Sequence, residues 1–160
     1  MLGYVCKYTP MELFEAMDTE ITRLEPSVTD FNHADTLMHA NICSYTKAVL
    51  EDVMEHDYEG VILTTCCDSI RRLYDTLKSQ FPDKFFFLLD IPRKFNDFAV
   101  TLYERQLKQM LTEYEAFSGK TLDLKRFVSM MQNKAALKKQ ENTRMSASAA
   151  SEKGNGQKLN

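Results

Sequence analysis

Two short, uninterrupted apolar runs constrain the fold of this chain more than any other feature. They are Val61 to Leu63 and Phe85 to Leu89, and each is followed by residues with helical apolar spacing. A strand that is apolar at every position is buried on both faces, and such strands are typical of parallel sheets. Strands of this kind alternating with helices predict an α/β fold, in which helices cover both faces of a parallel sheet.

Apolar periodicity predicts the remaining elements. The sequence begins with an apolar run, continues with an apparent capping box at Thr9 to Glu12, and alternates over Ile21 to Leu24. A helix is predicted over Ser44 to Glu55, whereas Pro26 to Asp35 is loop-like. The longest predicted helix has an inner side made of Phe95, Phe98, Ala99, Leu102, Tyr103, Leu107, Met110, Leu111, Tyr114 and Phe117.

A last helix is expected to start near Thr121. The predicted fold class is therefore α/β, with a parallel sheet of about four strands, helices on both faces and two C-terminal helices. With 160 residues the chain is long enough for one domain, expected over residues 2–137. Residues 141–160 contain no Ile, Val, Phe or Tyr, so we expect a disordered tail over residues 138–160.

Charge and hydropathy exclude several function classes. The net charge of −3 and the pI near 5.6 give no support for a nucleic-acid partner. No apolar run approaches the roughly 20 residues that a membrane helix needs. The first residues have neither a basic flank nor a long apolar stretch, as a secretory signal would. We therefore expect a cytoplasmic protein with no membrane partner.

Four cysteines carry the chemical interest, because disulfides are rarely maintained in the cytoplasm. Cys66 and Cys67 directly follow a predicted buried strand, and Cys43 precedes a predicted helix. Ligands bind α/β sheets where the strands end, and a thiol at a helix N-terminus has a lowered pKa. Metal binding and packing in the core are both open interpretations of the adjacent pair, whereas Cys6 is expected to be a core residue.

Two further features accompany these thiols. His39 lies four residues before Cys43 and could share a metal with it, although a surface histidine is the favoured interpretation. Basic residues are expected to form a rim around the same mouth, where they would bind phosphates or stabilise negative charge: Arg71, Arg72, Arg93 and Lys94. Alternatively, the first two belong to a solvated helix flank and pair with Asp68 or Asp75.

Several ordered segments resemble one family, the 2-hydroxyacyl-CoA dehydratases, which also contains benzoyl-CoA reductase subunits. The resemblance covers roughly residues 2–137. Its segments are Gly3-Tyr4, Tyr8-Thr9-Pro10, Asn41-Ile42-Cys43-Ser44-Tyr45, Thr65-Cys66-Cys67-Asp68-Ser69 and Asp90-Ile91-Pro92-Arg93-Lys94.

The resemblance implies oxygen-sensitive, anaerobic chemistry. Members of this family are longer, with two related α/β domains and a [4Fe–4S] cluster held between them by three cysteines. A second subunit and an ATP-dependent activator are the implied partners. The activator delivers one electron, which reduces the thioester of a 2-hydroxyacyl-CoA to a ketyl radical that expels the neighbouring hydroxyl.

The same resemblance identifies two cluster ligands, Cys43 and Cys67. Cys67 is preferred over Cys66 because an aspartate, Asp68, follows it directly, as in the family motif. The third family ligand belongs to the carboxyl-terminal domain, and no cysteine follows Cys67 here. We therefore expect that the second family domain is absent, that the cluster is incomplete or missing, and that the chain is inactive alone, either as a fragment or as a shortened paralogue.

Two other functions are alternatives. One is a related CoA-thioester reductase or an ATP-driven electron-transfer protein on the same scaffold. The other is a non-catalytic α/β binding module. No carboxylate or histidine is singled out by its spacing as a general base.

Overall fold

The structure is a computed structural model that describes residues 1–28 and 30–154, with side chains as far as residue 140. The chain divides into two compact units, one that ends at Leu122 and one that begins at Asp123. The first unit contains the sheet and the site residues. None of the described helices is both long and apolar enough to cross a membrane.

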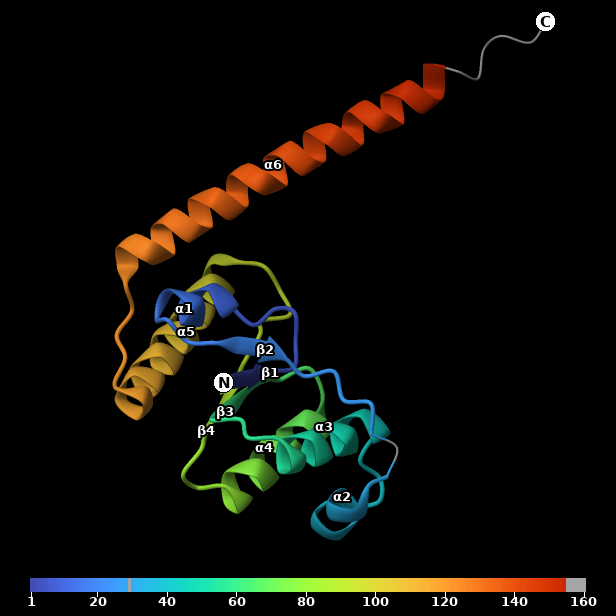
Figure 1. The fold of residues 1–160 in the computed structure, drawn as a ribbon, viewed down its shortest axis with the longest axis vertical. Helices are drawn as coiled ribbons and strands as arrows, with labels where there is room; N and C mark the ends of the chain where they lie inside the picture. The colour runs from blue at the N-terminus through green and yellow to red at the C-terminus, as the bar shows by residue number, and fades with distance from the viewer. Residues whose placement is uncertain (29, 155–160) are drawn as a thin grey trace, which may run out of the picture. The chain divides into compact units, whose positions relative to one another are not determined.

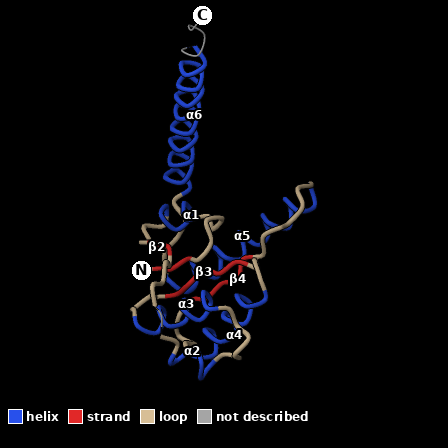
Figure 2. Tube along the Cα trace, turned by 90° about the vertical axis from the view of Figure 1, so that its right-hand side faces the viewer, coloured by secondary structure: helices blue, strands red, loops and turns tan. Residues whose placement is uncertain are grey.

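A four-stranded parallel sheet forms the centre of the first unit (Figures 1 and 2). Its strands are β1 (Leu2–Tyr4), β2 (Ile21–Arg23), β3 (Gly60–Thr64) and β4 (Phe85–Leu89), in the order β2-β1-β3-β4. Every neighbouring pair is parallel. The central strand β3 is buried at every position, as its continuous apolar sequence predicts. The predicted sheet is confirmed.

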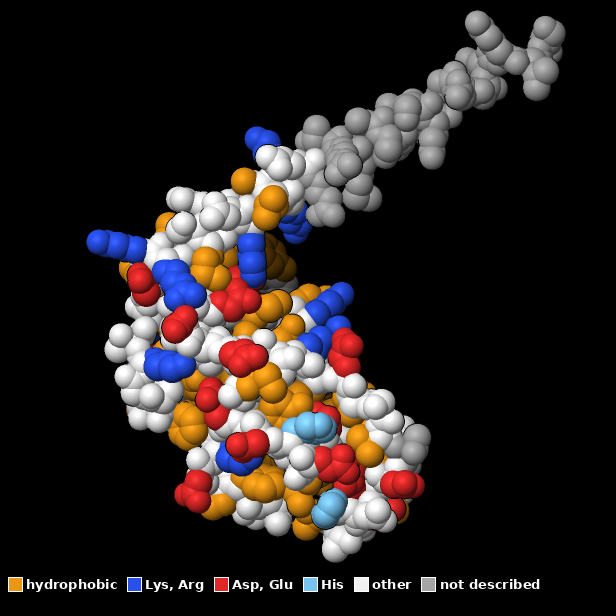
Figure 3. Space-filling view, in the orientation of Figure 1, with side chains coloured by type: hydrophobic (Ala, Val, Ile, Leu, Met, Phe, Trp, Pro, Cys, Tyr) orange, Lys and Arg blue, Asp and Glu red, His pale blue; other side chains and the backbone are white. Residues whose placement is uncertain are grey.

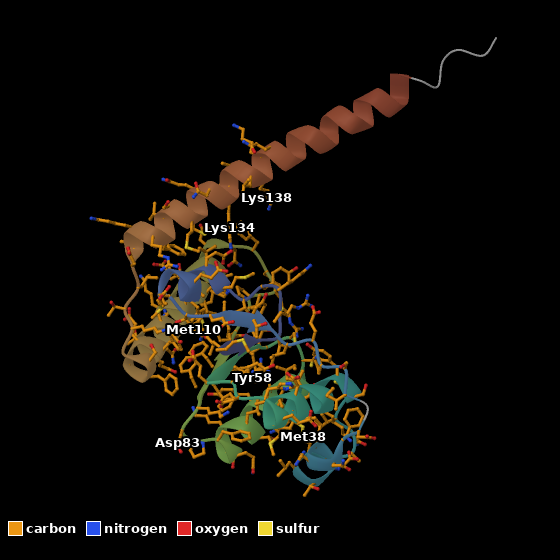
Figure 4. The ribbon with its side chains drawn as sticks, in the orientation of Figure 1. Met38, Tyr58, Asp83, Met110, Lys134 and Lys138 are labelled. Atoms are coloured by element: carbon orange, nitrogen blue, oxygen red, sulfur yellow. The ribbon has the colours of Figure 1, made fainter. Side chains whose placement is uncertain are left out.

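Helices cover both faces of this sheet (Figure 1). On one face, α3 (Ser44–Glu55) and α4 (Asp68–Gln80) pack against β3 and β4 with the buried residues Val49, Leu50, Val53, Val61, Leu63, Leu73, Leu77 and Phe86. On the other face lie α1 (Met11–Ala16) and α5 (Asp97–Ser118). Met38 and Met110 are both buried, on opposite sides of the sheet (Figure 4). The prediction of two covered faces is therefore confirmed.

Aromatic rings hold α5 to the sheet. The Tyr114 ring lies 5.1 Å from the Phe14 ring of α1 and 5.0 Å from the Phe85 ring of β4, both edge-on. Edge-to-face packing at this separation is a favoured aromatic geometry. Met110 and Tyr114 are fully buried, as the apolar spacing predicts.

The start of α5 differs from the prediction. The helix begins at Asp97 because the Asn96 side chain caps it, accepting the Ala99 N–H at 2.8 Å. Phe95 therefore lies before the helix and is 96% exposed, and Phe98 is 77% exposed. Their predicted place on the inner side of the helix is wrong, because Phe95 precedes the helix and Phe98, in its first turn, is exposed.

Two predictions near the N-terminus also need correction. The N-cap position of α1 is Pro10, with no side-chain cap, and the Thr9 hydroxyl is buried without a hydrogen-bond partner among the described residues. The predicted capping box is therefore wrong. A short helix, α2 (Asn32–Leu37), begins inside the segment expected to be a loop.

Contacts with α3 stabilise α2. The buried Glu51 carboxylate accepts the Ala34 N–H at 2.8 Å and lies 2.7 Å from His33 Nδ1. The Lys47 ammonium donates to Asp35 at 2.6 Å. These two pairs satisfy charged groups of α3 that would otherwise be buried alone.

The second unit contains one helix, α6 (Leu124–Gly154), and so completes the two predicted C-terminal helices. Gly119 ends α5 in the left-handed conformation, and the Asp123 side chain accepts the Arg126 N–H at the start of α6. The helix, with Lys134 and Lys138 among its side chains (Figure 4), extends beyond the predicted apolar stripe. It covers much of the expected tail at 138–160, of which residues 155–160 lie outside the described residues.

Candidate functional site

All four cysteines lie in segments that follow strands or precede helices at the edge where the strands end, here called the carboxyl edge. Cys6 follows β1, and Cys66 and Cys67 follow β3. Cys43 and Cys67 occupy the N-cap positions of α3 and α4. All four are free thiols; Cys6 is half-buried and the others are exposed. This is the edge at which open α/β sheets bind ligands.

Cys43 lies beside the first turn of α4. Its sulfur is 3.1 Å from the Thr46 hydroxyl, and it also has a hydrogen bond with the side chain of Ser69, two residues after Cys67. Partial burial opposes ionisation of Cys43, but the hydrogen bonds from Thr46, Ser69 and the Tyr45 backbone outweigh it and lower its pKa. The direction of this shift is the one expected for a thiol at a helix start.

Cys66 has the opposite electrostatic environment. Burial raises the pKa of its thiol, and the nearby thiols of Cys67 and Cys6 raise it further. Cys6 is close enough to affect Cys66 because β1 and β3 are paired neighbours, with Tyr4 opposite Ile62. Hence Cys6 belongs to the same rim as the cysteine pair, although the sequence predicted a core residue.

Tyr45 is a rim residue that the sequence analysis missed. It is 45% exposed, although its spacing placed it on the apolar face of the helix. Burial raises its pKa, Arg23 lowers it, and the thiols of Cys66 and Cys6 raise it, so the phenol lies within electrostatic reach of these groups. Its position directly after the Cys43-Ser44 helix start was the signal available in the sequence.

The thiols do not make a complete metal site by themselves. Within residues 1–28 and 30–154, no group of three or more His, Cys, Asp or Glu side chains is arranged to hold a metal ion. Exposed cysteine thiols are a residue type that ligates iron, but a full ligand set is not present in this part of the chain. His39 Nδ1 accepts the Asn41 N–H at 3.2 Å on the surface, in line with the surface interpretation.

The four predicted rim cations line two different hollows. Arg71 and Arg72 lie in a hollow of about 350 Å³ together with Asp68 and Asp75, and Arg72 is 3.7 Å from Asp75. This pairing is the one that the helix-flank interpretation expected for Arg72. Arg71 and Arg72 thus line a different hollow from Arg93 and Lys94, and a common role for the four cations stays a prediction.

Arg93 and Lys94 line the other hollow, of about 250 Å³, with Phe95, Val100 and Tyr103. Neither cation has an ion-pair partner in the described part of the chain. No carboxylate lines this hollow. It is therefore a positively charged hollow with an aromatic wall, which we call the aromatic hollow.

The loop of the cysteine pair and the loop of the aromatic hollow are joined directly. The Thr65 hydroxyl donates to Asp90 at 2.5 Å, and the Thr65 N–H donates to the Leu89 carbonyl at 3.0 Å. Thr65 immediately precedes Cys66, and Asp90 begins the segment that leads to Arg93. The thiols and the aromatic hollow therefore belong to adjacent loops of one edge.

A third hollow, of about 490 Å³, is acidic. Its lining includes Glu25, Asp30, Asp52, Glu55 and His56. Acidic and histidine side chains also gather over α2 and α3 in Figure 3. The sequence analysis did not predict this surface, because its members come from distant segments.

Comparison with known proteins identifies the family. The model of the 2-hydroxyglutaryl-CoA dehydratase D-component matches residues 6–153, beyond the predicted limit of the resemblance at residue 137. A search of the curated proteins finds no match. The match includes all four cysteines and the four cations Arg71, Arg72, Arg93 and Lys94. The chain therefore belongs to the 2-hydroxyglutaryl-CoA dehydratase D-component family.

Proposed function

We propose that this chain is part of a dehydratase that removes water from a 2-hydroxyacyl-CoA thioester. The observation that carries the proposal is the position of Cys43, whose thiol has a lowered pKa and contacts the first turn of α4 beside Cys67. Family membership supports the dehydratase component. The remaining argument concerns which residues take part.

Cys43 and Cys67 are the proposed protein ligands of a [4Fe–4S] cluster, with Cys66 as the alternative to Cys67. Thiolates are the usual protein ligands of such clusters. Cys67 is preferred because it occupies the N-cap position of α4 and is followed directly by Asp68, as in the family motif. When bound, the cluster would supply single-electron chemistry to the thioester.

A partner supplies the rest of the site in this proposal. The described residues provide no complete ligand set, so a second subunit or domain contributes at least one further ligand. An ATP-dependent activator delivers the electron. The 160 residues alone would then hold no stable cluster and have no activity.

Anaerobic reconstitution with iron and sulfide tests the ligand assignment. We expect substoichiometric cluster in the purified chain, and more when an external thiol such as dithiothreitol completes the ligand set. Cys43→Ser and Cys67→Ser should each abolish this gain, whereas the matched Cys6→Ser should retain it. A stoichiometric [4Fe–4S] spectrum from the chain alone would contradict the need for a partner, and equal loss in Cys6→Ser would contradict the assignment.

Activity requires a separate experiment with the assembled enzyme. The chain is combined anaerobically with a family second subunit, its activator, ATP and 2-hydroxyglutaryl-CoA, and formation of the enoyl-CoA is measured by mass spectrometry. We expect product with the unaltered chain and with Cys6→Ser, and none with Cys43→Ser. Reduction of the thioester without loss of water would instead indicate the related reductase.

A further inference from the structure

We infer that the aromatic hollow binds the nucleotide end of coenzyme A, with Arg93 and Lys94 on its phosphates and Phe95 against its adenine. The inference rests on the proposed function, because it assigns a place to the substrate of that reaction. It also assigns the phosphates to Arg93 and Lys94 alone, although the sequence analysis expected Arg71 and Arg72 at the same rim.

Charge is the first argument. The nucleotide end of coenzyme A carries several phosphate charges, and Arg and Lys are the side chains that bind phosphate. Arg93 and Lys94 have no ion-pair partner among the described residues, and no carboxylate lines their hollow. In the hollow of Arg71 and Arg72, by contrast, two carboxylates offset the two cations.

The aromatic wall is the second argument. Phe95 is 96% exposed although phenylalanine is a residue that folding normally buries. Purine rings stack on exposed aromatic side chains, and each such contact contributes roughly 1–3 kcal/mol. A phosphate ion has no ring that could stack on Phe95, whereas an adenine nucleotide can stack on Phe95 and pair its phosphates with the cations.

The hollow is built on an ordered frame. Asn96 caps α5 directly after Phe95, and the Tyr103 hydroxyl donates to the Tyr8 carbonyl at 3.5 Å from the opposite wall. The 22-residue helix α5 begins beside the hollow, so its N-terminal partial positive charge adds to that of Arg93. Asp97, in the first helical turn, is a nearby negative group but is not part of the lining.

The position of the hollow suits a long substrate. The Thr65 to Asp90 hydrogen bond joins the loop of the cysteine pair to the loop of the hollow, and Tyr103 of the hollow donates to Tyr8, two residues after Cys6. A coenzyme A whose nucleotide occupies the hollow can therefore extend its flexible pantetheine arm along the carboxyl edge toward the thiols. This direction places the thioester, rather than the nucleotide, at the cysteine rim.

Isothermal titration of the full iron-free chain with adenosine 3′,5′-bisphosphate tests the inference. We expect saturable binding that weakens about tenfold in Arg93→Gln and in Lys94→Gln, because each loses a charge-assisted contact. Phe95→Ala should also weaken binding about tenfold. The matched controls are Arg72→Gln, a cation of the other hollow, and Phe98→Ala, an exposed aromatic outside the lining.

Each outcome decides the inference. No binding, or equal weakening in the controls, overturns it. Inorganic phosphate that binds as tightly as the bisphosphate, without dependence on Phe95, also overturns it and indicates a free-phosphate site. If bisphosphate binding depends on Arg93 and Phe95 but the assembled enzyme has no dehydratase activity, the binding site is supported and the proposed function is overturned instead. If the assembled enzyme is active but Arg93→Gln and Phe95→Ala leave bisphosphate binding unchanged, only the inference is overturned.

Discussion

The two edges of the sheet are built differently. At the amino edge, where the strands begin, the Glu59 carboxylate accepts the Tyr114 hydroxyl at 2.6 Å and lies 3.6 Å from the N-terminal ammonium of Met1. The Thr19 hydroxyl lies 3.1 Å from the same Tyr114 oxygen. Gly60 packs so closely on Phe85 that no side chain fits there.

The carboxyl edge instead leaves reactive groups exposed. Three of its four cysteines are exposed, as are Arg93 and Phe95. Exposed groups contribute little to folding stability, whereas paired groups inside the protein contribute more. The comparison teaches that this fold places paired, stabilising groups at one edge and exposed thiols and cations at the other.

The largest expected effect is at Gly60. A Cβ at this position would lie 1.9 Å from the Phe85 carbonyl oxygen, which belongs to the paired backbone and cannot move aside. We expect Gly60→Ala to lower the free energy of unfolding by about 3 kcal/mol, measured by urea denaturation. At Gly3 the nearest atom is a Leu24 methyl at 3.1 Å, so Gly3→Ala should cost less; an equal cost at both glycines would contradict the prediction.

Tyr114→Phe should have the next largest effect. It removes the hydroxyl that Glu59 and Thr19 share while keeping the ring packing. We expect a loss of about 1–2 kcal/mol in the free energy of unfolding, the usual cost of leaving such partners unpaired. An unchanged urea midpoint would show that the amino edge does not depend on this hydrogen bond.

The same residue predicts a response to alkaline pH. Burial and the Glu59 acceptor raise the Tyr114 pKa from its usual 10.0 to about 12. A raised pKa in the folded state favours the protonated phenol, so its stabilisation is complete below pH 10 and is lost as the pH rises toward about 12. The stability gap between the wild type and Tyr114→Phe should therefore narrow over this range; a constant gap would contradict the linkage.

Cysteine alkylation sharpens the description of the carboxyl edge. The pKa of Cys43 is lowered and that of Cys66 is raised, relative to 9.0. Because the thiolate is the nucleophile, iodoacetamide should modify Cys43 at lower pH than Cys66, as measured by peptide mass spectrometry. Thr46→Val should shift the Cys43 profile to higher pH. If Cys43 and Cys66 were alkylated with the same pH dependence, the predicted difference between their pKa values would be contradicted.

The smallest expected effect is on the stability of carboxyl-edge variants. Arg93→Gln and Phe95→Ala replace exposed side chains with no described ion pair, so their unfolding free energies should stay within about 0.5 kcal/mol of the wild type. Thermal unfolding followed by circular dichroism measures this. A loss greater than about 1 kcal/mol would show that these residues support the fold and would break the distinction between the edges.

The sheet and its main helices were predictable because their signals are local. The runs at Val61 and Phe85 are apolar at each position, and their short length and their β-branched and aromatic residues favour a buried strand over a helix. The helix α2 was not predictable, since its stability comes from Glu51 and Lys47 of α3 rather than from its own spacing. Long-range pairing of this kind leaves no periodic pattern in the segment it orders.

The site was predictable only in part. The positions of Cys43 and Cys67 at helix starts follow from strand and helix boundaries, and the structure has both at N-cap positions. Their role as ligands stays a prediction. The four cations line two hollows, one along α4 and one just before α5. Residue type alone could not predict this division.

The hydrogen bond from Thr65 to Asp90 has a mechanical consequence. It ties the residue before Cys66 to the residue that begins the Arg93 loop. Together with the Thr65 N–H bond to the Leu89 carbonyl, it holds the first residues of the two loops at a fixed separation. A substitution that removes the Thr65 hydroxyl would therefore loosen both loops at once.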